Sequence, residues 1–442
     1  MKFFDLALKR SGMPIDEAKV FFKDLTNKPD SELINQNQQL AWDIFKHHQQ
    51  NSPFYQAFLD EKGGAGIQNW YDIPVLKKAD LQKPLAEMLS NGYDVKSVYS
   101  SNTSGSSGTP FYFARDKFCH AVTWASVIER YGWHGLDMNY SRQARFYGIP
   151  LEKIKYYKEK IKDWMGRRVR FPVFNLEDKV CARFLEVFKT TKFEYLYGYT
   201  NSLVVFAKYC VSQNIVLKNI CPTLKACLVT SEVCTKEDKQ VLEQGFGVRI
   251  VNEYGASELG VLAFEDANGN WVLNEETLLI EVVDSNGRPV ADGEQGTIVV
   301  TGLFNKAMPF IRYELGDIGV IEPGLRIGHR RVLSQLMGRT NDTATLPSGR
   351  KVPGLSFYYV SKSLLEKGDR IKELIVKQMA LDHFEIEYVA ATELTETEKN
   401  DVKEALERYL EPGLKITFLK SDNLERTRAG KLKNFQSMMA KQ

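Results

Sequence analysis

Apolar residues in the first ninety positions recur with the period of a helix. Leu40, Ile44 and Phe45, for example, have the spacing that places them on one helix face. Polar breaks interrupt this pattern several times. We therefore predict a helical segment over residues 1–90.

The hydrophobic pattern changes to that of strands over residues 272–338. The runs LLIEVV (278–283) and TIVVT (297–301) are rich in β-branched residues, which favour strands. Asn286-Gly287 and the segment from Gly293 to Gly296 have the composition of tight turns. These positions predict a β-rich portion of a large domain that spans residues 1–338.

A third pattern begins after Gly338. Two strand-like runs, ELIVKQM (373–379) and HFEIEYVA (383–390), precede a helical stretch, and LKITFL (414–419) follows it. We therefore predict a separate small α/β domain over residues 339–442.

The helix of this small domain has clear start and stop signals. Thr395 and Glu398 have the spacing of a capping box, and Pro412-Gly413 can end the helix. Its apolar face is predicted to contain Val402, Leu406 and Leu410.

A strongly basic stretch lies between these regions. Residues 151–170 contain eight basic and three acidic side chains, with Ile154, Tyr157, Ile161 and Trp164 at helical spacing. The pattern predicts a basic amphipathic helix. Packing of its apolar stripe under a solvated face is the favoured interpretation, and an anionic partner such as a membrane surface or a nucleotide-bearing acceptor is the alternative.

Length and charge narrow the class of protein. A chain of 442 residues with 43% hydrophobic content exceeds the size of a single core, so two or more domains are expected. The 59 Lys and Arg residues nearly balance the 56 Asp and Glu residues, which gives no reason to expect nucleic acid as a partner. No apolar run approaches the ~18 residues of a membrane span, so we expect no transmembrane segment.

The six cysteines lie at positions 119, 181, 210, 221, 227 and 234 and include no CxxC pair. Their spacing makes a poor disulfide framework, and no secretory leader is evident, which together favour a cytoplasmic protein. Cys221, Cys227 and Cys234 could hold a metal. Ordinary core thiols are the favoured interpretation, because the short ligand spacings of metal sites are missing.

The strongest local signal is the Ser/Gly-rich stretch SSNTSGSSGTP (100–110), which precedes the β-prone run Phe111-Tyr112-Phe113. Small residues let backbone N–H groups approach an anion, and hydroxyls add donors, so such a loop can hold phosphate oxygens. It lacks the lysine of a Walker loop. A flexible linker is the alternative.

Four further stretches follow in order along the chain: NEYGASE (252–258), MPFIRYELGD (308–317), GRTND (338–342) and RTRAGK (426–431). Each alone is a weak signal, since it could be a loop, a hairpin turn or a solvated tail. The ordered set is far more specific. It resembles the adenylate-forming superfamily of acyl-CoA synthetases, peptide-synthetase adenylation domains and luciferases, from about residue 95 to residue 435.

Within that superfamily, the RYELGD and NEYGASE stretches are most similar to phenylacetate-CoA ligases and their capsule-biosynthesis relatives. The first ninety residues add little to the match. The resemblance implies an α/β fold with a large ATP- and acyl-binding N-terminal domain and a small mobile C-terminal domain.

The implied reaction uses ATP and Mg²⁺ to convert a small carboxylic acid into its acyl-AMP. The acyl group then passes to a thiol, either of CoA or of phosphopantetheine on a carrier protein. A homodimer is a further association left open. By resemblance, Lys431 stabilises charge on the α-phosphate, Glu258 holds Mg²⁺, and Arg339 contacts ribose and phosphate oxygens.

The resemblance also implies a set of nucleotide contacts. Asp317 would accept hydrogen bonds from the ribose hydroxyls. The loop residues would hold the β- and γ-phosphates, namely Thr103, Ser104, Gly105, Ser106, Ser107 and Gly108. The NEYGASE residues would frame adenine and the α-phosphate, namely Asn252, Glu253, Tyr254 and Gly255. Ser231 and Glu232 would contact adenine.

Two positions depart from the family pattern. Asn341 stands at the expected hinge of the small domain, where many relatives have Asp or Lys, and Thr109 stands where many loops have lysine. Tyr197 and Tyr199 are candidate walls of the acyl pocket, with core packing as the favoured role.

Two other functions remain open from the sequence. The acyl group could pass to an amine or hydroxyl in envelope or capsule polysaccharide biosynthesis. The chain could also be a non-catalytic nucleotide-binding scaffold. Retention of Lys431, Glu258, Asp317 and Arg339 argues against the scaffold.

Overall fold

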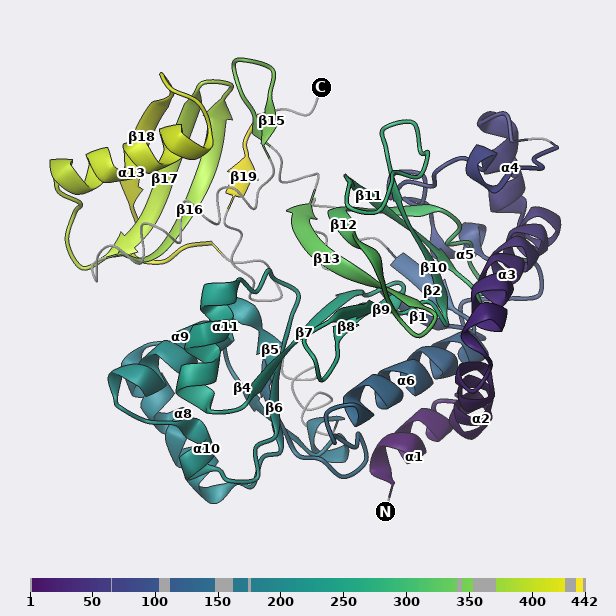
Figure 1. Ribbon diagram of the computed structural model, residues 1–442, viewed down its shortest axis with the longest axis horizontal. Coiled ribbons are helices and arrows are strands. Elements are labelled where there is room, and N and C mark those ends of the chain that lie inside the picture. The colour runs from purple at the N-terminus through teal and green to yellow at the C-terminus, as the bar shows by residue number, and fades with distance from the viewer. Residues whose placement is uncertain are drawn as a thin grey trace. The chain divides into compact units, whose positions relative to one another are not determined.

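The computed structural model describes residues 2–64, 66–102, 112–147, 162–173, 176–339, 344–352, 371–425 and 435–439 (Figure 1). The chain divides into two compact units. The first consists of Met1–Leu315 and Val320–Gln335, and the second of Gly316–Gly319 and Leu336–Gln442. No helix within the described ranges is both long and apolar enough to cross a membrane.

Helices occupy much of the N-terminal segment. They are α1 (Phe3–Arg10), α2 (Ile15–Thr26), α3 (Asp30–Asn51), α4 (Pro53–Glu61), the short 3-10 turn η1 (Trp70–Asp72) and α5 (Leu85–Met88). The start of α4 follows from its sequence, because the Ser52 side chain accepts a hydrogen bond from the Tyr55 backbone N–H and Pro53 occupies the first turn. The face of α3 that contains Ile44 and Phe45 is buried, as predicted.

An eleven-stranded sheet forms the centre of the fold, in the order β10-β11-β12-β13-β9-β8-β7-β6-β5-β3-β4. Its strands are β3 (Gln143–Phe146), β4 (Arg168–Phe171), β5 (Tyr195–Tyr199), β6 (Ala226–Thr230), β7 (Arg249–Ala256), β8 (Gly260–Glu265), β9 (Trp271–Leu273), β10 (Leu278–Val283), β11 (Gln295–Gly302), β12 (Tyr313–Ile327) and β13 (Arg330–Arg339). A separate antiparallel hairpin consists of β1 (Tyr99–Asn102) and β2 (Tyr112–Arg115). The predicted mixed α/β class is confirmed.

The strands β4, β3, β5, β6 and β7 pair in parallel, whereas β7, β8 and β9 pair antiparallel. Connecting helices cover the parallel part: α6 (Lys117–Gly132), α8 (Asp178–Thr190), α9 (Thr200–Ser212), α10 (Leu217–Ile220) and α11 (Lys236–Phe246). In Figure 1, α8, α9 and α11 gather beside one face of β4–β6. Parallel strands joined by helices bring their carboxyl ends to one edge of the sheet.

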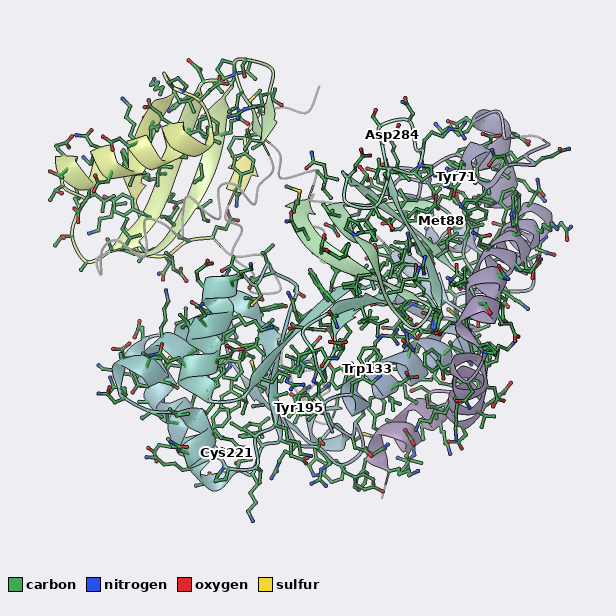
Figure 2. All side chains as sticks on the ribbon, in the orientation of Figure 1. Tyr71, Met88, Trp133, Tyr195, Cys221 and Asp284 are labelled. Atoms are coloured by element: carbon green, nitrogen blue, oxygen red, sulfur yellow. The ribbon has the colours of Figure 1, made fainter. Side chains whose placement is uncertain are left out.

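The two faces of this parallel sheet have different side chains. Under α8, α9 and α11, phenylalanine rings pack with centroid separations from 4.8 to 5.8 Å, namely Phe146, Phe171, Phe184, Phe188, Phe193, Phe206 and Phe246. On the opposite face, Tyr195 of β5 packs against Tyr131 of α6, which also stacks on Phe264 of β8. Tyr195 and Trp133 of this second layer are labelled in Figure 2.

A buried ion pair ties α6 to the antiparallel part of the sheet. An Arg130 guanidinium nitrogen lies 2.8 Å from Glu276 Oε2, and both side chains are fully buried. Arg330 also pairs with Glu276. Burial alone would raise the pKa of Glu276, but Arg130 and Arg330 lower it to about 2.

The strands predicted for LLIEVV and TIVVT are confirmed as β10 and β11, which pair antiparallel. Gly287 and Gly293 have φ values of 74° and 93°. Both values lie in the left-handed region that glycine adopts at tight turns.

The second unit contains the strands β14 (Ala344–Thr345), β15 (Lys351–Val352), β16 (Ile371–Ala380), β17 (His383–Ala390), β18 (Lys415–Lys420) and β19 (Phe435–Ser437). Four of these form a sheet in the order β18-β17-β16-β19. The predicted helix is confirmed as α13 (Glu396–Tyr409), with a complete capping box between Thr395 and Glu398. Val402, Leu406 and Leu410 are buried as expected.

The predicted basic helix is wrong at its C-terminal end. Residues 148–161 lie outside the described part, but Arg168–Phe171 form strand β4 and pair with β3. The left-handed φ of 51° at Arg167 is incompatible with a continuing helix. Beyond it, Phe171 is buried in the phenylalanine layer, so packing in the sheet outweighs the helical spacing.

Candidate functional site

The candidate site lies at the carboxyl ends of the parallel strands. Tyr147 follows β3, Tyr199 ends β5, Ser231 and Glu232 follow β6, and β7 ends at Ala256. Open α/β sheets bind ligands at such an edge. Four segments that are far apart in the sequence therefore meet where a nucleotide can bind.

Glu258 is the best-defined member of this site. It lies in the turn after β7 and is only 7% exposed. The Tyr313 hydroxyl donates a hydrogen bond to Glu258 Oε1 at 3.0 Å. Tyr313 belongs to the MPFIRYELGD stretch, so this bond joins two of the stretches that we identified in the sequence.

Arg115 connects the same turn to the hairpin that flanks the Ser/Gly loop. Its Nε donates to the Glu258 carbonyl at 3.1 Å, and a terminal nitrogen donates to the Ser257 carbonyl. Arg115 ends β2, which confirms the β-prone run predicted after the loop and pairs with β1. The base of the loop is thus held against the NEYGASE turn. Thr103, Ser104, Gly105, Ser106, Ser107 and Gly108 themselves, and Thr109, lie outside the described residues.

The other NEYGASE residues occupy the strand β7 and have contrasting environments. Glu253 is buried, and its carboxylate accepts hydrogen bonds from the Tyr197 hydroxyl at 2.9 Å and the Tyr131 hydroxyl at 3.3 Å. Burial raises the pKa of Glu253 despite these bonds. Both carboxylate oxygens already have partners inside the protein. The predicted nucleotide contact of Glu253 stays a prediction.

Asn252, Tyr254 and Gly255 complete this strand. The Asn252 N–H donates to Glu265 Oε2 at 3.0 Å, and the Tyr254 ring lies against Trp271. A Cβ at Gly255 would lie 2.9 Å from the Gly260 carbonyl oxygen. Gly255 therefore permits the close approach of β8, and its predicted place beside the α-phosphate stays untested.

Ser231 and Glu232 have definite local roles after β6. Ser231 has a left-handed φ of 69°. A Glu232 carboxylate oxygen accepts a hydrogen bond from the Asn201 N–H at 2.8 Å in the first turn of α9, a favourable place for an anion. Their contact with adenine stays a prediction.

The MPFIRYELGD stretch enters its strand through a strained residue. Arg312 has a φ of 45° and is 1% exposed. Its guanidinium pairs with Glu281 at 3.1 Å and donates to the carbonyls of Tyr71 at 3.1 Å and Ile73 at 2.9 Å. Arg312 therefore fixes the backbone that presents Tyr313.

The remaining predicted site residues are only partly located. Asp317 lies in β12 and is 9% exposed. Arg339 ends β13, and its side chain lies outside the described part of the structure. Asn341 and Lys431 also fall outside the described ranges.

Sequence reasoning missed Arg115, Tyr313 as a partner of Glu258, and Tyr147. Tyr147 stacks parallel to Tyr197 with centroids 5.5 Å apart and lies 4.2 Å from the Tyr199 ring. Tyr313 lies within the MPFIRYELGD stretch and Arg115 lies close to the Ser/Gly stretch, so these positions could have identified both residues as site candidates. Tyr147 had no such signal.

Two of the three clustered cysteines, Cys221 and Cys227, are buried in the protein. Among the described residues, no group of three or more His, Cys, Asp and Glu side chains is placed to hold a metal. Cys221 lies 3.5 Å from the carbonyl oxygens of Thr191 and Phe193, and Cys227 is fully buried on β6. Figure 2 shows Cys221 beside α10. The burial of Cys221 and Cys227 agrees with the favoured interpretation as core thiols.

Comparison with known proteins tests the resemblance. No protein-family model matches the chain. It is 27% identical over 309 residues to the phenylacetate-coenzyme A ligase of Thermus thermophilus, covering 66% of each chain. It is 21% identical over 324 residues to protein CapK of Staphylococcus aureus, covering 71% of this chain and 69% of that one.

Solved structures agree over a longer range. A 2-hydroxyisobutyryl-CoA ligase, solved in the postadenylation state, matches with a TM-score of 0.67 at 18% identity over 92% of this chain and 89% of its own. The chain has the adenylate-forming ligase fold. ATP-bound MatB from Rhodopseudomonas palustris also matches, with a TM-score of 0.54 at 15% identity over 76% of this chain and 66% of its own. The predicted resemblance to this superfamily, and to phenylacetate-CoA ligases within it, is confirmed.

Proposed function

We propose that this protein is an AMP-forming acid–thiol ligase. It activates a small carboxylic acid with ATP as the acyl-AMP and transfers the acyl group to CoA. The observation that carries the proposal is the meeting of the Ser/Gly hairpin, the NEYGASE turn and the RYELGD strand at Glu258 through Arg115 and Tyr313. The fold and the similarity to phenylacetate-coenzyme A ligases support it.

The chemical demand of the first step is to stabilise charge on the α-phosphate as the acid attacks it. Catalysis of phosphoryl and nucleotidyl transfer depends mainly on positioned charges. We assign Lys431 to the α-phosphate, Arg339 to ribose and phosphate oxygens, and Asp317 to the ribose hydroxyls. These assignments follow the order of the motifs.

Glu258 is our candidate ligand for Mg²⁺. Among the described residues, only its Oε1 accepts a hydrogen bond, and Oε2 is left for a cation. One carboxylate suits Mg²⁺, which binds proteins through few carboxylates and keeps phosphate and water ligands. When bound, the ion would neutralise phosphate charge.

The acceptor and the cellular setting are further parts of the proposal. CoA or a carrier-protein phosphopantetheine receives the acyl group, and the protein acts alone or as a homodimer. The cysteines in the structure are unpaired thiols, in keeping with a cytoplasmic enzyme.

Acid-dependent ATP–pyrophosphate exchange tests the reaction class. We would measure exchange with aryl, fatty, amino and sugar acids, with Glu258→Gln as a matched variant. Exchange that requires an acid and Glu258 supports the proposal. ATP binding without exchange for any acid would instead indicate a non-catalytic nucleotide-binding protein.

Product analysis then identifies the acceptor. Incubation of acid and ATP with CoA should yield a thioester and AMP. Formation of an amide or ester when amino acids or amino sugars replace CoA, with no thioester from CoA, would contradict the thiol assignment while leaving adenylation intact.

A further inference from the structure

The face of the parallel sheet that packs against α6 becomes polar toward its carboxyl edge. Arg145 of β3 is in register with Tyr197 of β5, and Tyr147 follows directly after the end of β3. On the opposite face, Phe146 is in register with Gly198 of β5 and Val229 of β6, so that face is apolar at the same level. The polar groups are thus confined to the face that continues into the candidate site.

Arg145 lies beside two aromatic rings that stack on each other. Its guanidinium carbon lies 4.5 Å from the Tyr147 ring centroid and 5.3 Å from that of Tyr197. Its Nε is buried and has no hydrogen-bond partner in the described part of the chain. The guanidinium therefore has two aromatic contacts and, among those residues, no carboxylate within ion-pair distance.

On the neighbouring strand, two arginines share one carboxylate. Arg168 Nε and Arg170 of β4 both bond to the Asp163 carboxylate, at 2.6 and 2.9 Å. Arg170 is the register partner of Arg145 across β3 and β4. Arg145 is therefore the member of this group that lacks a carboxylate within the described residues.

Arg145 attracts the Glu253 carboxylate and opposes the rise in the Glu253 pKa, but the two groups are not in ion-pair contact. The Glu253 carboxylate bonds to Tyr131 and Tyr197, and no ion pair joins it to Arg145 in the described structure. Arg145 keeps part of its side chain exposed, and a partly desolvated cation gains from an anionic partner. An arginine is well suited to bind a carboxylate or phosphate with two parallel hydrogen bonds.

We propose that the acid substrate carries a second anionic group, which Arg145 binds beside Tyr147 and Tyr197 while the reacting carboxylate lies at the sheet edge. The proposal rests on the proposed function and names its substrate class. Arg145 precedes Tyr147 by two residues, or roughly 7 Å along a strand. The two acidic groups of the substrate are therefore separated by several bonds.

Matched acid pairs test this inference in the full-length protein. Adipate is compared with hexanoate, and 4-carboxyphenylacetate with 4-methylphenylacetate, by ATP–pyrophosphate exchange. We expect kcat/KM to be about 10- to 100-fold higher for each diacid, the range for a hydrogen bond to a charged group. This comparison uses the wild-type protein and needs no variant to fold.

Variants then assign the preference to Arg145. Arg145→Met should abolish the diacid preference and leave activity with the monoacids, whereas Arg145→Lys should keep part of the preference. Arg168→Met is the matched control, because Asp163 retains Arg170, and its preference should remain that of the wild type. Thermal unfolding of each variant checks that the fold is intact.

Three results would overturn the inference. Equal or greater wild-type activity with the monoacids would exclude a second anionic group and leave the proposed function standing. An equal loss for both members of a pair in Arg145→Met would assign Arg145 to the reacting carboxylate, to ATP or to the fold. A lack of ATP–pyrophosphate exchange with every acid tested would contradict the proposed function and, with it, this substrate class.

Discussion

The hydrogen bond between Tyr313 and Glu258 allows a direct test of how the site is assembled. Tyr313→Phe removes one hydroxyl and nearly preserves the shape of a side chain that is 1% exposed. The lost bond, at 3.0 Å to a carboxylate that is 7% exposed, belongs to a class worth about 1.5–3 kcal/mol. We expect the free energy of unfolding to fall by about that amount or somewhat less.

The same substitution should also change the response to Mg²⁺. Loss of a group that orients a metal ligand typically costs about 10-fold or more in metal affinity or activity. We therefore expect the Mg²⁺ concentration for half-maximal ATP–pyrophosphate exchange to rise about 10-fold in Tyr313→Phe, at fixed ATP and acid.

Tyr195→Phe is the matched control for this experiment. The Tyr195 hydroxyl is also buried and accepts a hydrogen bond from Gln143 at 2.9 Å, but it does not contact Glu258. It should lose stability and keep the wild-type Mg²⁺ requirement. An unchanged requirement in Tyr313→Phe, or the same shift in both variants, would refute the assignment of Glu258 to the metal.

Three other predictions test separate parts of the molecule. Lys431→Ala should slow acyl-AMP formation by about 10²- to 10³-fold and affect thioester formation from preformed acyl-AMP much less; equal losses in both half-reactions would exclude its role at the α-phosphate. Asp317→Ala should weaken ATP binding in calorimetry with the thermal unfolding transition retained, and unchanged affinity would contradict the ribose contact. Glu276→Gln should lower the unfolding free energy by about 3–5 kcal/mol at pH 7, because Arg130 is left buried without its anion. Since the folded pKa of Glu276 is about 2 against an ordinary 4.5, the wild type should lose this contribution as pH falls from 4.5 toward 2, and denaturation of the variant should lack that part of the pH dependence.

Local patterns predicted the elements whose stability is local. The capping box of Thr395 and Glu398 and the β-branched residues of LLIEVV identified α13 and β10, because each signal lies within one element. The helix predicted through residue 170 was wrong for the opposite reason. Arg168–Phe171 form a strand because β3 and the phenylalanine layer stabilise it, and neither is visible in the local spacing.

The candidate site was predictable as a set of stretches and not as a set of contacts. NEYGASE and RYELGD were recognised in order, yet the bond between Tyr313 and Glu258 joins residues 55 positions apart. The bonds from Arg115 to Ser257 and Glu258 span more than 140 positions. Such pairings depend on strand order, which a single sequence does not specify.

Motif matching alone misses the residues of the N-terminal segment that support the candidate site. The first ninety residues added little to the resemblance, but Leu76 pairs with the start of β12 as a short parallel bridge to Tyr313. The Leu76 N–H donates to the Arg312 carbonyl at 3.1 Å, and the Glu314 N–H donates to the Leu76 carbonyl at 2.9 Å. Arg312 in turn bonds to Tyr71 and Ile73 in the same segment.

These contacts make the N-terminal segment part of the support for Glu258. A left-handed, buried arginine costs free energy, which its ion pair with Glu281 and its backbone acceptors offset. Trp70 also donates to Glu281 at 3.1 Å, so the anion that neutralises Arg312 is itself held by η1. The position of the Tyr313 hydroxyl therefore depends on residues 70–76 as much as on the RYELGD stretch that contains it.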